Sequence, residues 1–423
     1  MRPIPHLNAL RPRGARLALI LFALAAIGGC ECHNRPPTAP VVVPPLSAVI
    51  VAPGTDTLRV GARAQFTAVA LDTLGQPTGS VSFAWTSSDP AVATVDATGR
   101  VAGVGEGVSL VIVAAGGRKD TATVFVYADT AWYTQTSGSA RNLLGVFFLD
   151  DGRSGWAVGS GGAIVHTADA GVHWAPQTSN SSANLNAVWF TSAGEGWIAG
   201  NTGTVLHTLD AGTTWTRVDV SAGQNLMALC FADPAHGWVV GGNGQLIRTQ
   251  DGGLTWSHQT LTGATLRGVA AAGVNDVWFV SDVGEIFGTH TGGDVVFRVL
   301  PAIAAQALRA VVRRSASEAW AVGDAGLAPR TVVTPDSVAW ELRNAGAAYQ
   351  LWGVHYPDAT IGYAVGFNGG GAILRTDDAG VTWQPQAAHT SRQLNGVWFV
   401  DALRGWAVGD AGVIVHTARG GLR

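Results

Sequence analysis

Short runs of alternating apolar and polar residues fill most of the chain after residue 46, separated by Gly, Pro, Asp and Thr turns. Alternation with a period of two is typical of half-buried β-strands. Before residue 128, such runs lie at 47–51, 58–60, 64–71, 81–87, 100–104, 108–114 and 121–127. This pattern predicts a β-sandwich domain over residues 47–127.

After residue 127 the pattern becomes a repeat. Each unit contains a strand such as LNAVWF (185–190), then GWIAG (196–200), TVLHT (204–208), a tight turn and TTWTRV (213–218). One aromatic residue recurs at spacings of 41, 41, 40, 42, 43 and 43, at Trp156, Trp197, Trp238, Trp278, Trp320, Tyr363 and Trp406. Four short strands per unit of this length are typical of propeller blades. We therefore predict an all-β chain whose residues 128–423 form a seven-bladed β-propeller.

The segment TAWYTQTS (130–137) predicts how the ring closes. It aligns with VHWAPQTS (172–179), the fourth strand of the first full unit, so that Trp132 takes the place of Trp174. The seventh unit stops before a fourth strand of its own. We expect the earlier segment to complete the last blade and to pair two edges that would otherwise be bare.

The first 29 residues have the three parts of an export signal. Four arginines, an apolar run over 17–27 and two glycines precede Cys30. The sequence around 27–30 (IGGC) resembles a bacterial lipobox, which implies that Cys30 becomes a lipid-modified N-terminus. An ordinary secretory signal and an uncleaved anchor remain alternatives. Residues 30–46 are proline-rich and predict a stiff tether, placing the protein in the periplasm or at the cell surface.

Composition and charge narrow the possible partners. With 47% hydrophobic and 13% charged residues and 56 glycines, the chain is too apolar for disorder and favours β-structure. A formal charge of -3 gives no general attraction for nucleic acid, so we expect no nucleic-acid partner. If Cys30 is acylated, Cys32 and Cys230 remain, and the sequence leaves open whether they pair. Cys230 is predicted to be a buried small hydrophobe.

Residues 81–107 closely resemble the bacterial immunoglobulin-like group 2 domain. In that family a tryptophan strand leads into Ser-Ser-Asp-Pro, Val-Ala-Thr-Val-Asp and Gly-Arg-Val. The matching residues are Trp85, 87–90, 92–96 and 99–101. The resemblance covers residues 47–127 and implies a spacer or an adhesive module.

Four repeat units carry the pattern Thr-x-Asp-x-Gly-x-x-Trp, with aspartates at Asp169, Asp210, Asp251 and Asp378. The pattern resembles the Asp box, or bacterial neuraminidase repeat. A carboxylate in such a turn can accept backbone N–H bonds, and the glycine permits positive φ. Because equivalent aspartates lie on different blades, we expect them to be structural and not to form one active site.

The longer pattern GWAVGxxGxIxHTxDAGxxW resembles the photosystem II stability and assembly factor family over residues 130–423. Members of that family are seven-bladed propellers that bind an early photosystem subunit without catalysis. The resemblance implies an exported, protein-binding propeller. The preceding immunoglobulin-like domain is a departure from the photosynthetic members, so the photosystem partner is not carried over.

Sialidases also contain Asp boxes, so the alternative hypothesis is that this propeller is a sialidase-like glycoside hydrolase. Their chemistry needs an arginine triad, a tyrosine paired with glutamate and an aspartic acid, and their Phe/Tyr-Arg-Ile-Pro motif is missing. No such pairing is evident for the propeller tyrosines, Tyr133, Tyr349, Tyr356 and Tyr363. The histidines His166, His207 and His416 share one repeat position on different blades, so they cannot share a metal ion. We expect no catalytic residue, no cofactor and no metal.

A binding face is predicted from propeller topology, because the loops entering the innermost strands gather at one mouth of the central channel. A leucine is retained there in every unit, followed by a variable residue: Leu144, Asn186, Met227, Arg267, Arg309, Trp352 and Asn395. Arg267, Arg309 and Trp352 fall on consecutive blades and predict a cationic, aromatic patch for an acidic or glycan-bearing partner. The alternative is a solvated rim without a partner.

The sequence thus favours an exported, lipid-anchored, non-catalytic propeller that binds or scaffolds envelope or surface proteins. A carbohydrate-active protein, either a sialidase-like hydrolase or a glycan-binding lectin, is one alternative, and a cell-surface adhesin is another. The partner's identity, the membrane, the phototrophy of the host and the oligomeric state stay open.

Overall fold

The computed structural model describes residues 46–78, 81–105, 107–127, 132–299, 306–315, 317–333 and 338–422. The expected signal sequence, the lipidation site Cys30 and the tether up to residue 45 lie outside these ranges. Strands dominate the described residues, which confirms the all-β prediction. Their helical elements are four 3-10 turns: η1 (Ser160–Gly162), η2 (Gly242–Gly244), η3 (Asp324–Gly326) and η4 (Asp410–Gly412). Among the described residues, no helix has the length and apolarity that a bilayer crossing requires.

The N-terminal domain is an immunoglobulin-like β-sandwich built from three groups of paired strands. The first pair is β1 (Leu46–Ala52) with β4 (Thr67–Asp72). A four-stranded sheet has the order β2 (Thr55–Arg59), β9 (Arg118–Tyr127), β8 (Gly107–Ala115) and β5 (Ala84–Ser87). A three-stranded sheet has the order β3 (Arg63–Gln65), β7 (Arg100–Gly103) and β6 (Ala93–Val95). Alternate apolar side chains from these strands form one core.

The structure corrects the strand expected at 64–71. This run divides at Phe66 into β3, which pairs with β7, and β4, which pairs with β1. Phe66 is fully buried and its N–H donates to the carbonyl of Gly99 at 2.9 Å, so the chain changes sheets where this ring enters the core. Gly99 has a φ of +80°, and a Cβ there would lie 2.8 Å from the Trp85 ring.

The C-terminal domain is a propeller. Among the described residues it contains seven four-stranded sheets, called blades 1 to 7 below. Blade 1 is β11 (Leu143–Phe148), β12 (Gly155–Gly159), β13 (Ile164–Thr167) and β14 (Ala175–Gln177). Blade 2 is β15 (Leu185–Phe190), β16 (Gly196–Gly200), β17 (Thr204–Thr208) and β18 (Thr216–Val218). Blade 3 is β19 (Leu226–Phe231), β20 (Gly237–Gly241), β21 (Gln245–Thr249) and β22 (Ser257–Thr260).

The remaining blades follow the same order except for the last. Blade 4 is β23 (Leu266–Ala271), β24 (Val277–Ser281), β25 (Ile286–Thr289) and β26 (Val296–Arg298). Blade 5 is β27 (Leu308–Arg313), β28 (Ala319–Gly323), β29 (Arg330–Val333) and β30 (Val338–Glu341). Blade 6 is β31 (Gln350–His355), β32 (Gly362–Phe367), β33 (Gly371–Thr376) and β34 (Gln384–Gln386). Blade 7 is β35 (Leu394–Phe399), β36 (Gly405–Gly409), β37 (Val413–Thr417) and, as its outer strand, β10 (Tyr133–Thr136).

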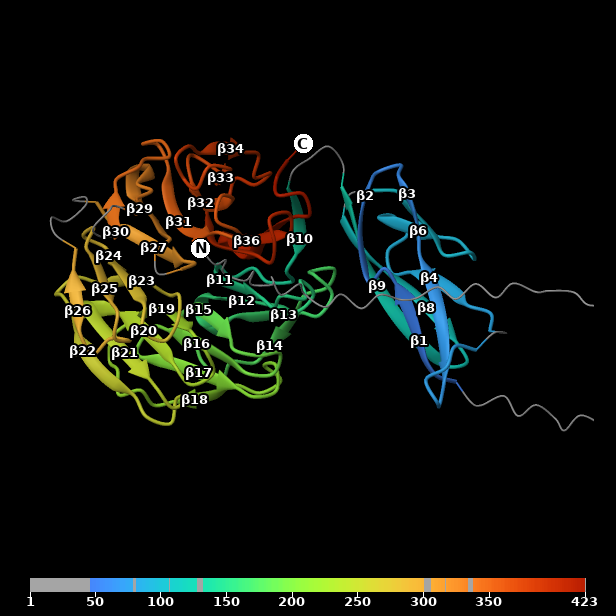
Figure 1. Cartoon of the computed structure of the whole chain (residues 1–423), viewed down its shortest axis with the longest axis horizontal. Helices are drawn as coiled ribbons and strands as arrows, with labels where there is room; N and C mark the ends of the chain where they lie inside the picture. The colour runs from blue at the N-terminus through green and yellow to red at the C-terminus, as the bar shows by residue number, and fades with distance from the viewer. Residues whose placement is uncertain are drawn as a thin grey trace, which may run out of the picture. The chain divides into compact units, whose positions relative to one another are not determined.

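The blades follow one another in chain order around a common centre (Figure 1). The first strand of each blade contacts the first strand of the next, and β35 of blade 7 contacts β11 of blade 1. β10 pairs antiparallel with β37, with Tyr133 opposite His416 and Thr136 opposite Val413. The outer strand of blade 7 therefore comes from the segment before blade 1, and three strands come from the other end of the propeller.

The recurring aromatic residues of the second strands lie between neighbouring blades. The ring ending the first strand of a blade stacks on the second-strand aromatic of the preceding blade: Phe148 on Trp406, Phe190 on Trp156 and Phe399 on Tyr363, each at 3.6 Å between centroids. In blade 5 the terminal residue is Arg313, whose guanidinium lies 5.4 Å from the Trp278 ring centroid. The hydrophobic cores therefore join adjacent blades to one another.

Candidate functional site

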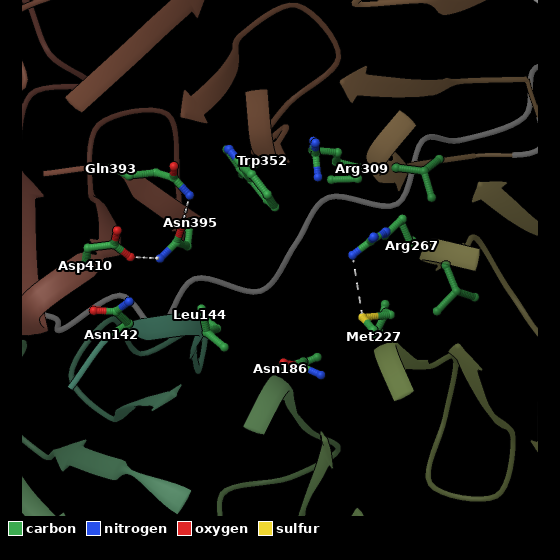
Figure 2. Close-up of a pocket in the computed structure, with 16 residues that line it drawn as sticks. Asn142, Leu144, Asn186, Met227, Arg267, Arg309, Trp352, Gln393, Asn395 and Asp410 are labelled. Atoms are coloured by element: carbon green, nitrogen blue, oxygen red, sulfur yellow. Dashed lines mark hydrogen bonds between the residues drawn. The ribbon is translucent and has the colours of Figure 1, made fainter. Parts of the chain in front are cut away.

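The seven variable residues that follow the first-strand leucines line one pocket at the centre of the propeller (Figure 2). Its volume is about 480 Å³, within the usual range of ligand sites. The residues of the predicted binding face that line it are Arg267, Arg309, Trp352, Asn186 and Asn395, together with Leu144 and Met227. Asn142, Gln393 and Asp410, which the sequence argument did not select, also line it.

A β-bulge places each of these seven residues in the pocket. In blade 2, Leu185 pairs with Gly200 and Ala187 pairs with Ala199, which leaves Asn186 without a partner on β16. The register shifts at the equivalent residue in all seven blades. A bulge bends its strand and redirects a side chain, and the preceding leucines are fully buried. The pocket lining is therefore a repeated backbone feature that alternation in the sequence did not reveal.

Arg309 and Trp352 form a fixed platform on one side of the pocket. The Arg309 guanidinium carbon lies 3.8 Å from the centroid of the Trp352 ring. The same guanidinium donates to both carboxylate oxygens of Asp324, at 2.5 and 2.9 Å. Two parallel bonds of this kind hold an arginine in one orientation. The Arg309 charge is therefore compensated, and one face of Trp352 is covered.

Arg267, in the neighbouring blade, is held more loosely. Its Nη2 lies 3.5 Å from Oδ2 of Asp282, and its Nη1 lies 3.8 Å from the sulfur of Met227. Its side chain is 32% exposed, compared with 17% for Arg309. Arg267 is therefore the more accessible of the two pocket guanidiniums.

The opposite side of the pocket is lined by amides and a carboxylate (Figure 2). Asn395 donates to Oδ1 of Asp410 at 3.0 Å and to the carbonyl of Leu143 at 2.9 Å. Its own oxygen accepts a bond of 2.7 Å from Gln393. The Leu143 bond crosses from blade 7 to blade 1, so these side chains also connect the blades.

Four of the bulge residues contact the residue 15 positions later, directly after the second strand of the same blade. These pairs are Asn186 with Asn201, Arg267 with Asp282, Arg309 with Asp324, and Asn395 with Asp410. These partners were not predicted from the sequence, although the repeated spacing of 15 residues could have identified them. Because Asp282, Asp324 and Asp410 accompany two arginines, the cationic patch predicted from the sequence is charge-compensated in the structure.

Aromatic rings lie deeper in the channel, three residues further along the first strands. Phe147 contacts Trp398 at 4.5 Å and Trp189 at 5.4 Å between ring centroids. Trp189 and Trp398 meet edge to face at 5.7 Å, and His355 lies 4.5 Å from Trp398. These contacts join blades 6, 7, 1 and 2. Three strand residues span about 10 Å, which sets the depth of this layer, named the ring layer below.

The Asp-box aspartates are engaged within their own turns. In blade 1 the hydroxyl of Thr167 donates to Asp169 at 2.8 Å, and the N–H of His173 donates to the same oxygen at 2.9 Å. Asp210, Asp251 and Asp378 make the equivalent bonds. Hydrogen bonds from Thr214, through its N–H and then its hydroxyl, hold the pKa of Asp210 below its usual value. These carboxylates stabilise turns and lie outside the pocket lining.

Two of the propeller tyrosines are part of the packing, Tyr356 as well as Tyr363, which the repeat already assigned to it. Tyr356 stacks on Trp320 at 3.9 Å, and Tyr363 stacks on Phe399 at 3.6 Å. Tyr363 donates to the carbonyl of Ala402 and accepts from Arg375. Burial raises the pKa of both phenols well above the usual value. Neither tyrosine lines the pocket.

The repeated histidines stack on the second-strand tryptophans. The ring distances are 4.7 Å for His166 on Trp156, 3.8 Å for His207 on Trp197 and 4.4 Å for His416 on Trp406. Burial lowers the pKa of His416 to about 3 and that of His355 to about 4. Within the described ranges, no three His, Cys, Asp or Glu side chains are grouped so that they could hold a metal ion.

Acidification is expected to destabilise the propeller before its carboxylates titrate. The unfolded chain binds protons at His416 and His355 near pH 6.5, whereas the folded protein binds them only near pH 3 and 4. The free energy of unfolding should therefore fall as the pH drops from 6.5 to 4.5, by about 1.4 kcal/mol per pH unit for each imidazole. Urea unfolding at several pH values measures this slope. His416→Phe should reduce it, and an unchanged slope would contradict the assignment.

Cys230 is buried between blades 3 and 4. Burial raises the pKa of its thiol to about 12. It packs as a small apolar side chain, and Cys32 lies outside the described residues.

Comparison with known proteins agrees with both domains. Residues 46–126 match the bacterial Ig-like domain (group 2), and residues 125–224 and 217–294 match the photosynthesis system II assembly factor YCF48. Among curated proteins the chain has no match. A solved structure of YCF48 bound to D1 peptide is 20% identical, with a TM-score of 0.57, over 68% of this chain and 95% of that one.

Other solved propellers are similar as well. YCF48 from Cyanidioschyzon merolae is 21% identical, with a TM-score of 0.57, over 68% of this chain and 98% of that one. Virginiamycin B lyase from Staphylococcus aureus is 13% identical, with a TM-score of 0.58, over 68% and 99%. Identities this low support the fold alone. The chain thus joins a domain similar to the group 2 bacterial Ig-like family to a propeller similar to the photosystem II assembly factor YCF48.

Proposed function

We propose that this chain is an exported, lipid-anchored, non-catalytic protein that binds an envelope or surface protein through its central pocket. The observation that carries the proposal is the pocket itself, where seven bulges direct side chains from seven blades into one space. Arg267, Arg309 and Trp352 supply arginine and aromatic groups, which are enriched where proteins bind each other most strongly. A peptide bound by the similar propeller YCF48 adds support.

Export and anchoring rest on the sequence. A basic segment, an apolar run and Cys30 stand in the order of a lipoprotein signal, followed by a proline-rich stretch. In this proposal the tether and the immunoglobulin-like domain hold the propeller away from the membrane, in the periplasm or at the cell surface.

The pocket chemistry favours binding over the enzymatic alternatives. Among the residues that the structure describes, none that lines the pocket is a histidine, whereas a histidine-to-alanine variant of virginiamycin B lyase is described as catalytically inactive. Sugar-binding sites commonly use an open aromatic face, but Arg309 covers one face of Trp352. A peptide segment therefore fits the site better than a glycan does.

The test is capture of the partner by the double variant Arg267→Ala/Arg309→Ala. Crosslinking in native cells followed by mass spectrometry should recover a partner with the wild-type chain and at least tenfold less of it with the variant, because arginines at the centre of an interface commonly contribute more than about 1 kcal/mol each. The control is Arg63→Ala/Arg217→Ala, which makes the same charge change at exposed positions of β3 and β18. Equal recovery with both double variants would refute the pocket as the binding site.

A further inference from the structure

The two arginines of the pocket differ in how closely a neighbouring aspartate pairs with each guanidinium. Asp324 meets Arg309 with two short bonds, whereas Asp282 approaches Arg267 only to 3.5 Å. A separation of 3.5 Å is at the limit of a hydrogen bond. The guanidinium N–H groups of Arg267 are therefore only weakly hydrogen-bonded by the aspartate of its own blade.

The position of Asp282 explains this difference. Its Oδ1 accepts a hydrogen bond of 3.0 Å from the backbone N–H of Thr265. This bond ties the carboxylate to the start of blade 4 and leaves only Oδ2 facing Arg267. The Asp324 carboxylate turns both of its oxygens to Arg309. Asp282 is thus near enough to attract Arg267 and too constrained to form a bidentate pair with it.

The ring layer limits how an occupant can enter. Phe147, Trp189 and Trp398, from the consecutive blades 1, 2 and 7, contact one another, and His355 of blade 6 adjoins them. Since these rings lie about 10 Å along the strands from the bulge residues, the space above them is shallow. The site suits the tip of a chain or loop and does not suit a strand threaded through the propeller.

We infer that the pocket binds a carboxylate at the tip of a partner peptide through Arg267, and that Asp282 is an internal competitor that sets the affinity. An incoming carboxylate can form the bidentate pair that Asp282 cannot. Arg309 and Trp352 then act as the rigid wall beside it. This inference rests on the proposed function, because it names the chemistry and the controlling residue of the same site.

The inference predicts opposite effects for two substitutions at one ion pair. Asp282→Asn removes the competing charge and should tighten binding of acidic peptides about tenfold, whereas Arg267→Gln should weaken it at least tenfold. Neither effect should extend to peptides in which the carboxylate is replaced by an amide. Asp219→Asn makes the same charge change at an exposed loop, where its carboxylate accepts the N–H of Ser221, and should leave binding unchanged.

The probe is a library of random eight-residue peptides bound to the full chain, with affinities of selected peptides measured by calorimetry. Each selected peptide, with any internal Asp or Glu replaced by Asn or Gln, is compared in three forms: a free C-terminal carboxylate, a C-terminal amide, and an amide with one internal glutamate. Loss on amidation identifies a chain end as the source of the carboxylate, and rescue by glutamate identifies a side chain. The inference would be overturned if peptides bound equally well in all three forms. It would also be overturned if Asp282→Asn and Arg267→Gln left peptide affinity unchanged.

Failure of this inference and failure of the proposed function would give different experimental results. If the double variant Arg267→Ala/Arg309→Ala loses its cellular partner while acid and amide peptides bind alike, the pocket binds proteins by another chemistry. If the double variant captures its partner normally, the proposed function fails and the inference fails with it.

Discussion

Replacing Trp132 with alanine is expected to lower the free energy of unfolding of the propeller by about 3–5 kcal/mol, the usual cost of truncating a buried tryptophan. The side chain is 1% exposed. It packs edge to face on Tyr363 and Phe399, at 6.4 and 5.8 Å between centroids, and its N–H donates to Gln386 at 2.7 Å. These contacts tie β10 to blades 6 and 7. Denaturant unfolding followed by circular dichroism measures the loss.

The matched control is Trp256→Ala, at the same repeat position in blade 3. Trp256 is partly exposed, and its N–H donates to the carbonyl of Gly253 within its own turn. Trp256 also packs edge to face on Trp197 of blade 2, at 5.8 Å between centroids. Removing it should cost less, because its ring is already partly exposed and less apolar area is lost. A loss equal to that of Trp132→Ala would mean that the closing strand has no special role.

Replacing Cys30 with serine is expected to abolish labelling of the protein by radioactive palmitate and to move it from the membrane fraction to the soluble fraction. The reason is chemical, since the proposed lipid is attached through the thiol, and acyl chains supply the membrane affinity. Labelling and fractionation of cells that express the full chain measure both effects.

Cys32→Ser is the control for this experiment, because it makes the same exchange two residues later. It should keep both the label and the membrane association. Palmitate retained by Cys30→Ser, or lost from Cys32→Ser, would assign the anchor to a different residue or mechanism.

The periodic part of the fold could be predicted from the sequence because one residue type marks each repeat. The seven second-strand aromatics fall in β12, β16, β20, β24, β28, β32 and β36, one in each blade. The alignment of Trp132 with Trp174 placed the segment before blade 1 opposite β37, and Tyr133 pairs with His416 there. Spacing and alternation are local properties, so a single sequence displays them.

Contacts between repeats could not be read in the same way. The partner of Trp406 is Phe148, at the far end of the repeat region. No pattern within one repeat shows that the first-strand ring belongs to the next blade. The bulges could not be predicted either. A single unpaired residue such as Asn186 leaves the apolar pattern intact on both sides of the bulge.

The sequence predicted that the residues of the proposed binding face lie together, but it did not predict the charges around them. Topology placed Arg267 and Arg309 at one mouth, and both line the pocket. Their charge balance depends on Asp282 and Asp324, which follow the second strands and carry no motif. The residues of the first strands therefore indicate where the pocket lies. The charge balance of the pocket depends on residues that follow the neighbouring second strands.

The composite last blade has a consequence for biosynthesis. A chain made from its N-terminus releases β10 long before β37, its hydrogen-bonding neighbour, has been synthesised. During that interval the β10 edge is open, and bare edges invite pairing with other chains. The ring can be completed only after the final strands have emerged, and, for a chain exported as proposed, only after they too have reached the far side of the membrane. Premature termination after Gln386, the last residue of blade 6, and before Val413, the first residue of β37, would therefore leave six finished blades and an unpaired β10 edge that can bind other chains.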